Sequence, residues 1–159
     1  TTEIYTLSLH DALPICTVRS ILEQKEDKII SVHPDDTLLD AIASLAKNKI
    51  GAVVVLDKRG HLKGILSERD VVSNMAKKGM EACSIAVSHV MTKEVTYVKP
   101  HQSLDECLKL MIDRNFRHLP VLEEEQVIGM ISIRDVMKAV LDERAFQIDQ
   151  LEYYITNTY

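Results

Sequence analysis

The stretch Gly64-Ile65-Leu66-Ser67-Glu68-Arg69-Asp70-Val71 has a close copy 65 residues further along, Gly129-Met130-Ile131-Ser132-Ile133-Arg134-Asp135-Val136. The glycine, serine, arginine, aspartate and final valine of the two copies stand at the same positions. Upstream, Val55-Leu56 corresponds to Val121-Leu122 at an offset of 66, so the second copy is one residue shorter in between. Residues 29–72 and 95–137 therefore align as an internal repeat.

Each copy predicts the same order of elements, β-α-β-β-α. An extended segment comes first, and a helix follows whose start carries a capping signal. Thr37-x-x-Asp40 is a weak form of the capping box, and Ser103-x-x-Glu106 is a full one. Short β-branched runs then predict strands, and a second helix begins at Ser67 or Ser132 and reaches about residue 77 or 143. The expected extended segments and strands are 28–32, 52–56 and 62–66 in the first copy, and 94–98, 119–122 and 127–131 in the second.

Apolar residues at helical spacing predict which face of the first helix in each copy enters the core. They are Leu38, Ile42, Leu45 and Ala46 in the first copy, and Leu104, Leu108, Met111 and Ile112 in the second. One copy of about 60 residues would bury little surface alone. The expected fold is therefore α/β, with two β-α-β-β-α repeats packed together about a pseudo-two-fold axis.

The composition limits the classes of function. The chain has 159 residues, of which 46% are hydrophobic, and a net charge of −5. This charge disfavours a general nucleic-acid binder, whose phosphate contacts need a basic face. No apolar run approaches the roughly 18 residues of a membrane-spanning helix, and the first residues show no secretory pattern. Three widely spaced cysteines (Cys16, Cys83 and Cys107) indicate reduced thiols and a cytoplasmic protein.

The sequence contains no nucleophile elbow, phosphate-binding glycine loop, dinucleotide-binding glycine motif or zinc-protease motif. The histidines are scattered, and no carboxylate or thiol stands near them at metal-ligand spacing. We therefore expect no enzyme activity, no metal and no required cofactor. Any bound phosphate would have to be held by arginine, histidine, serine and helix ends.

The repeated motif resembles a tandem pair of CBS domains, named after cystathionine β-synthase. The resemblance covers roughly residues 17–143. It is carried by the two Gly-x-hydrophobic-Ser-x-Arg-Asp blocks, by Arg117-His118-Leu119-Pro120-Val121, and by Val90-Met91-Thr92 at the start of the second repeat. The chain is similar to small stand-alone bacterial proteins that consist of little more than one such pair.

The resemblance implies a regulatory module that binds a ligand without chemistry. Such pairs bind adenine nucleotides (AMP, ADP or ATP), and some bind NAD(H), S-adenosylmethionine or cyclic dinucleotides, in a cleft between the repeats. They commonly form flat homodimers. Because no effector domain is evident in this sequence, we expect a separate, unidentified partner protein to read the bound state. The alternative is a dimeric interaction module that needs no ligand.

The resemblance implies that Asp70 and Asp135 accept hydrogen bonds from the two hydroxyls of a ribose, because a carboxylate offers acceptors to a cis-diol. The alternative is that each carboxylate is part of a helix cap together with Ser67 or Ser132. The two serines are expected to cap their helices, and the resemblance implies that their hydroxyls also reach phosphate. The two roles are compatible, because helix N-termini attract anions.

Further ligand contacts implied by the resemblance are basic. Arg69 and Arg134 adjoin the aspartates and are either phosphate ligands or solvated side chains. Arg117 and His118 precede a strand, where they would contact phosphates at the centre of the cleft; the alternative is that they are ordinary surface residues. The first repeat has Gly51-Ala52 at the matching positions. This difference predicts two unequal sites.

The expected division is residues 17–78 for the first CBS domain, 79–88 for a linker and 89–143 for the second domain. Residues 1–16 form an extension that belongs to neither repeat. Within it, residues 5–15 resemble a translated sequencing-adapter tract, which predicts a non-native segment; the alternative is a native edge strand. Residues 144–159 are expected to continue the last helix, with Ala145, Ile148, Leu151 and Ile155 packed on the pair or on a second copy.

Overall fold

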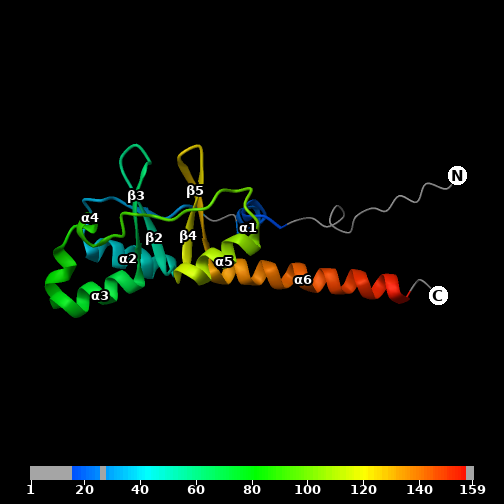
Figure 1. Cartoon of the computed structure of the whole chain (residues 1–159). Helices are drawn as coiled ribbons and strands as arrows, with labels where there is room; N and C mark the ends of the chain where they lie inside the picture. The colour runs from blue at the N-terminus through cyan, green and yellow to red at the C-terminus, as the bar shows by residue number, and fades with distance from the viewer. Residues whose placement is uncertain (1–15, 26–27, 157–159) are drawn as a thin grey trace.

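The computed structural model describes residues 16–25 and 28–156. The expected α/β fold with two repeats is confirmed (Figure 1). The expectations for residues 1–15 lie outside the described residues. The elements are α1 (Val18–Lys25), β1 (Ser31–Val32), α2 (Leu38–Asn48), β2 (Ala52–Leu56), β3 (Leu62–Ser67), α3 (Glu68–Lys78), the 3-10 helix η1 (Gly79–Ser84), α4 (Val87–Val90), α5 (Leu104–Arg114), β4 (His118–Glu123), β5 (Gln126–Ser132) and α6 (Ile133–Thr156).

The two sheets repeat the same register. In the first, β1 pairs parallel to β2, and β2 pairs antiparallel to β3, with Ala52 opposite Ser67. In the second, β4 pairs antiparallel to β5, with His118 opposite Ser132. The counterpart of β1 is a single parallel bridge from Val98 to Val121. The strands therefore confirm the alignment of the two copies at the level of hydrogen-bonded pairs.

Both first helices start with a complete capping box. Asp40 Oδ2 accepts a hydrogen bond from Thr37 N at 2.9 Å, and Asp40 N donates to Thr37 Oγ1 at 3.2 Å. Ser103 and Glu106 make the equivalent pair of contacts. The first signal was predicted to be the weaker one, but an aspartate at this position also reaches back to the cap.

Each repeat has its own core, and the helix that precedes each repeat packs in the core of the other. Val18 and Ile21 of α1 are buried with Leu104, Leu119 and Ile131 of the second repeat. Val87 and Val90 of α4 are buried in the first core, as is Ala82 of η1. Residues 79–88, expected to be a linker, are therefore folded onto the first repeat. This exchange ties the two repeats into one body.

The buried face of the first helices is rotated from the predicted one. Ala41 and Cys107 are fully buried at equivalent positions in α2 and α5. Ala46 is exposed, and Ile112 is 63% exposed, so the prediction that they enter the cores is wrong. Helical periodicity alone is compatible with either of two adjacent faces of α2 and α5. Packing against the strands buries the face that contains Ala41 and Cys107.

Helix α6 is one continuous helix of 24 residues, which confirms that the second helix of the repeat runs on into the tail. Its first part packs on α5 and β5, and its last turns extend away from the body (Figure 1). No helix among residues 16–25 and 28–156 is long and apolar enough to cross a membrane.

The β4–β5 turn provides a prediction about stability. Its two central residues, Glu124 and Glu125, have φ values of 47° and 65°, a left-handed conformation that Asn and Gly adopt at lower cost. We expect Glu124→Asn combined with Glu125→Gly to raise the free energy of unfolding by about 1–2 kcal/mol, measured by urea denaturation. Lys58→Asn, in the other hairpin and without positive φ, is the control. An equal gain in that variant would contradict the explanation.

Candidate functional site

A cleft of about 940 Å³ lies between the two repeats, and we call it the inter-repeat cleft. The first repeat contributes the segment before β1, the end of α2 and the start of β2. The second contributes the start of β4, part of β5 and the start of α6, together with α1. The lining residues are Leu22, Lys25, Lys28, Ile29, Ile30, Asn48, Lys49, Ile50, Gly51, Ala52, Val54, Glu68, Arg117, His118, Ile128, Gly129, Met130, Ser132, Ile133, Arg134 and Asp135.

The structure brings together five of the eight predicted site residues. Those that line the inter-repeat cleft are Arg117, His118, Ser132, Arg134 and Asp135. Ser67, Arg69 and Asp70 do not line it. The two copies of the motif are thus placed differently with respect to this cleft, although their local structures are alike.

Asp135 is held by several donors on one oxygen. Its Oδ2 accepts hydrogen bonds from Ser132 N at 2.7 Å, Ser132 Oγ at 2.8 Å and Lys25 Nζ at 3.0 Å. Its Oδ1 accepts none from the described residues. Burial would raise the pKa of Asp135, but the hydrogen bonds from Ser132 and Lys25 outweigh it and hold the pKa below its usual range. The helix cap therefore keeps an ionised carboxylate whose second oxygen can accept.

Asp70 has the same local geometry without the lysine. Its Oδ2 accepts from Ser67 N and Ser67 Oγ, each at 2.8 Å. It forms no ion pair with any residue in 16–25 or 28–156. The cap interpretation of both aspartates is thus correct, and it leaves one oxygen of each carboxylate available.

Lys25 is a site residue that the sequence reasoning missed. It stands at the end of α1, which packs against β5 through Leu22 and Gly129. The corresponding contact in the other repeat joins Met91 and Gly64. Nine residues lie between Leu22 and Val32, whereas six lie between Met91 and Val98. The sequence could have indicated Lys25 through this difference in length. The longer connection before the first repeat places Lys25 beside the cleft, and, among the described residues, the second repeat has no equivalent lysine there.

The same difference in length gives the two copies of the motif different surroundings. After α4, Thr92 pairs with Ile65 through two backbone hydrogen bonds of 2.9 and 3.0 Å, which ties this segment to the edge of β3. The counterpart of Ile65 is Met130, whose backbone pairs only with β4 within the described chain. Met130 instead lines the inter-repeat cleft.

His118 lies against the first repeat. A Cβ at Gly51 would be 3.0 Å from His118 Cε1 and 3.4 Å from Glu68 Oε2, so the absence of a side chain at Gly51 makes room for the imidazole. Burial lowers the pKa of His118, although Asp135 and Glu68 oppose the shift. The imidazole is therefore mainly neutral at pH 7, where it can donate one hydrogen bond.

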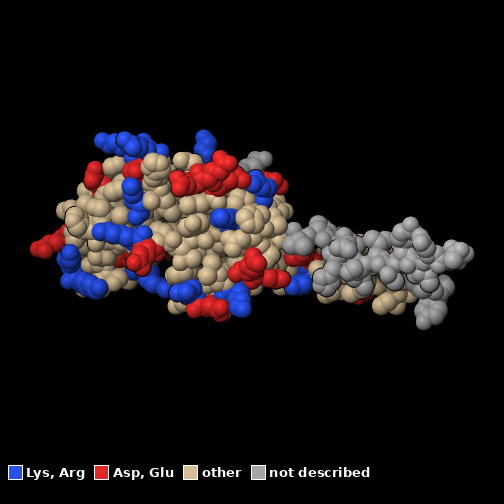
Figure 2. All heavy atoms as spheres, turned by 45° about the horizontal axis from the view of Figure 1, so that its top comes forward, with Lys and Arg blue, Asp and Glu red and all other residues tan. Residues whose placement is uncertain are grey.

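The inter-repeat cleft is basic although the chain is acidic. Five basic side chains line it (Lys25, Lys28, Lys49, Arg117 and Arg134) against two acidic ones (Glu68 and Asp135). On the face of the body shown in Figure 2, basic and acidic side chains are interspersed. Electrostatics therefore favours a phosphorylated ligand in this cleft over an extended polyanion on that face.

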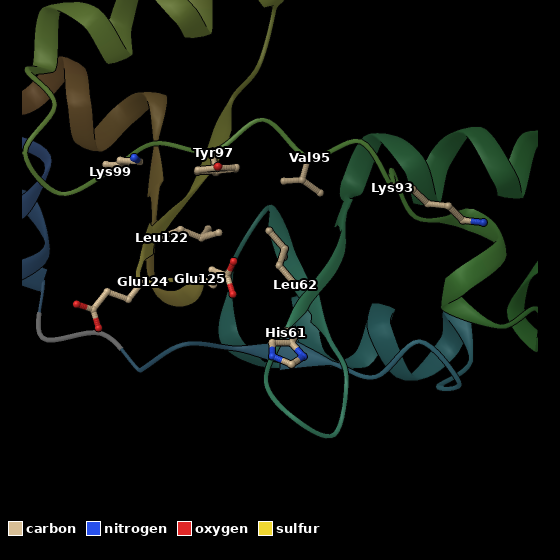
Figure 3. A pocket seen from close by; sticks show the side chains of 9 residues that line it. All are labelled: His61, Leu62, Lys93, Val95, Tyr97, Lys99, Leu122, Glu124 and Glu125. Carbon is tan, nitrogen blue, oxygen red and sulfur yellow. The ribbon is translucent and has the colours of Figure 1, made fainter.

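A second, smaller pocket of about 580 Å³ shares no lining residue with the inter-repeat cleft. In Figure 3, Val95 and Tyr97 come from the segment that passes over the two hairpins carrying Leu62 and Leu122. None of the predicted site residues lines it. Among residues 16–25 and 28–156, no group of three or more His, Cys, Asp and Glu side chains could hold a metal ion.

Comparison with known proteins identifies the repeated unit. The model of the CBS domain matches residues 18–77 and 87–142. The mitochondrial CBS domain-containing protein CBSX3 of Arabidopsis thaliana is 35% identical over 129 residues, which are 79% of this chain and 63% of that protein. The chain thus spans less than two thirds of this relative.

Solved structures share the fold. A CBS-domain-containing protein of Agrobacterium tumefaciens, 38% identical, aligns with a TM-score of 0.75 over 79% of this chain and 93% of that one. Two more distant structures align with TM-scores of 0.68 and 0.73. They are CBSX2 in complex with AMP, 24% identical, and the CBS domain pair of MJ0100 in complex with 5′-methylthioadenosine and S-adenosylmethionine, 22% identical. They cover 80% and 82% of this chain, and 98% and 99% of their own.

Proposed function

Because this chain belongs to the CBS domain family and carries two copies of the domain, we propose that it is a regulatory module that binds an adenine nucleotide in the inter-repeat cleft. One observation carries the proposal. The cleft joins a capped, ionised carboxylate that has an available oxygen to a wall with five basic side chains. A nucleotide needs both features, since its ribose offers a cis-diol and its phosphates are anionic.

The ribose is assigned to Asp135. The three contacts on Oδ2 hold the carboxylate in place, and Oδ1 can accept from both ribose hydroxyls. Hydrogen bonds to a charged acceptor contribute about 1.5–3 kcal/mol each. This contact is therefore expected to supply a large share of the affinity.

The phosphates are assigned to Arg117 and Arg134, which offer planar donor groups, with His118 and Ser132 as additional donors. Lys28 and Lys49 enlarge the positive potential of the same cleft. Apolar side chains from the segment before β1 and from β5 (Ile29, Ile30 and Met130) line the remaining wall, where an adenine ring can pack. The cleft volume also lies within the ordinary range for small-molecule sites.

Two fold relatives that were solved with adenosine compounds support this ligand class. CBSX2 holds AMP, and the MJ0100 pair holds S-adenosylmethionine and 5′-methylthioadenosine. Because these structures are less than 25% identical to this chain, they establish its fold only. That this chain also binds an adenosine compound is our proposal. We further propose that the protein is a cytoplasmic homodimer without catalytic activity. A nucleotide that bridges the repeats would change their relative angle, and a separate effector protein would recognise that change.

Isothermal titration of the full chain, stripped of carried-over nucleotide, tests the proposal. The panel is adenosine, AMP, ADP, ATP, NADH, S-adenosylmethionine and a cyclic dinucleotide. We expect saturable binding of at least one nucleotide with one site per chain, and AMP binding weaker by about tenfold or more in Arg117→Ala, whereas adenosine binding changes little. No binding to folded protein would overturn the proposal and favour the ligand-independent interaction module, which the exposed apolar surface of α6 also favours.

A further inference from the structure

His118 is the one histidine among the described residues that line the inter-repeat cleft. Its side chain is half-buried, and neither ring nitrogen makes a hydrogen bond with a residue in the described part of the chain. Histidine is also the side chain whose ordinary pKa lies nearest to neutral pH. The ring is therefore the group in this cleft that is suited to exchange a proton with solvent under physiological conditions.

The imidazole lies between carboxylates that belong to different repeats. In the second repeat, His118 stands opposite Ser132 in the β4–β5 pair, and Ser132 caps the helix that carries Asp135. In the first repeat, a Cβ at Gly51 would lie 3.3 Å from His118 Nε2 and 3.4 Å from Glu68 Oε2, so these two atoms flank the same point. The backbone of Glu68 is held there by a hydrogen bond of 2.9 Å to the carbonyl of Gly51. Both carboxylates favour a positive charge on the ring.

Burial and two neighbouring cations keep the ring neutral in the protein by itself. Burial has the largest effect and lowers the pKa of His118, and the positive charges of Lys25 and Arg117 lower it further. Asp135 and Glu68 act in the opposite direction without overcoming burial. A nucleotide phosphate held by the basic wall of the cleft would bring a third negative group close to the ring. An opposite charge within about 4–6 Å favours the charged form of a histidine, so the phosphate raises the pKa of His118.

We propose that nucleotide binding in the inter-repeat cleft is coupled to the uptake of a proton from solvent by His118, so that the cleft binds phosphate more tightly as the pH falls. This inference rests on the proposed function and adds regulation by pH to the same site. The protonated ring donates from both nitrogens, so one can bond to the phosphate while its charge attracts Glu68 of the first repeat. The gain in affinity is complete below the pKa of His118 in the free protein. It is lost as the pH rises through the higher pKa of the complex.

Titration calorimetry of the full chain with AMP at about pH 6.5 and about pH 8 tests the coupling. The quantity compared is the affinity at the lower pH divided by the affinity at the higher pH. We expect this ratio to be about threefold or more larger in the wild type than in His118→Asn. The comparison cancels the ionisation of AMP itself, whose phosphate has a second pKa of about 6, because both proteins meet the same ligand. His101→Asn is the matched control, since it removes an exposed histidine outside the cleft, and it should keep the wild-type ratio.

The proton itself is counted by repeating the titration at about pH 7 in buffers that differ in their heat of ionisation. We expect the wild type to take up roughly half a proton more per AMP than His118→Asn, and Glu68→Gln should reduce this excess because it removes a facing negative charge. The wild type is informative even without the variants. AMP is partly protonated at this pH and releases protons when it binds as a dianion, so net uptake has to come from the protein.

The outcomes separate this inference from the proposed function. AMP that binds without net proton uptake, or with the same pH ratio in the wild type and in His118→Asn, would overturn the coupling and leave the proposed function intact. A ratio that falls equally in His101→Asn and His118→Asn would overturn the assignment of the proton to His118. Folded wild-type protein that binds no AMP at either pH would overturn the proposed function and the coupling together.

Discussion

Asp135→Asn is expected to weaken AMP binding by about 30-fold or more while the protein stays folded. The asparagine keeps an oxygen that can accept from Ser132, so the start of α6 retains part of its cap. It loses the charge that strengthens the bonds from the ribose hydroxyls, and loss of charge-assisted hydrogen bonds amounts to about 2 kcal/mol or more. Titration calorimetry measures the affinity, and thermal unfolding measures the structural cost.

Asp70→Asn is the matched control for this variant. Asp70 makes the same two contacts with Ser67 as Asp135 makes with Ser132, but it does not line the inter-repeat cleft. Both variants should therefore lose stability through a weakened cap, by about 0.5–2 kcal/mol. AMP affinity should fall in Asp135→Asn alone. Equal affinity in the two variants would show that the ribose is not held by Asp135.

Gly64→Ala is expected to destabilise the protein more than the equivalent change at Gly129. A Cβ there would lie 2.8 Å from the backbone oxygen of Thr92 and 2.5 Å from Met91 Sδ. The Thr92 backbone is itself bonded to Ile65, so it cannot move away without losing two hydrogen bonds. We expect the free energy of unfolding to fall by about 2–3 kcal/mol, in the upper part of the range for overpacking a core.

Gly129→Ala is the corresponding change in the second repeat. Its Cβ would meet Leu22 Cδ2 at 2.6 Å, and the other close atoms belong to the same side chain at 3.5 Å or more. Because a leucine can change rotamer, we expect a cost of about 1 kcal/mol or less. Urea denaturation of both variants gives the comparison. A Gly129→Ala variant that is as unstable as Gly64→Ala would contradict the role assigned to the Thr92 backbone.

Much of this protein could be predicted without coordinates. The repeated block, the strand that starts at Ala52, the strand predicted from Val127 and found to begin one residue earlier, the caps at Thr37 and Ser103, and the helix that continues past Glu143 are encoded by residues close together in the chain. Hydrogen bonding along a helix or across a hairpin depends on such local patterns. For the same reason, Ser132 and Asp135 could be placed at one helix start before their surroundings were known.

Other features depended on contacts between distant segments. The sequence offers two equivalent aspartates, and only the packing of α1 on the second repeat distinguishes them, because it brings Lys25 to Asp135 and leaves Met130 open to the cleft. The contact of His118 with Gly51 likewise joins residues of opposite repeats. Thus the sequence by itself determined the elements and the repeat, whose patterns are local. The tertiary structure decided which copy of the motif faces the cleft, because connection length and packing between repeats act only once the chain is folded.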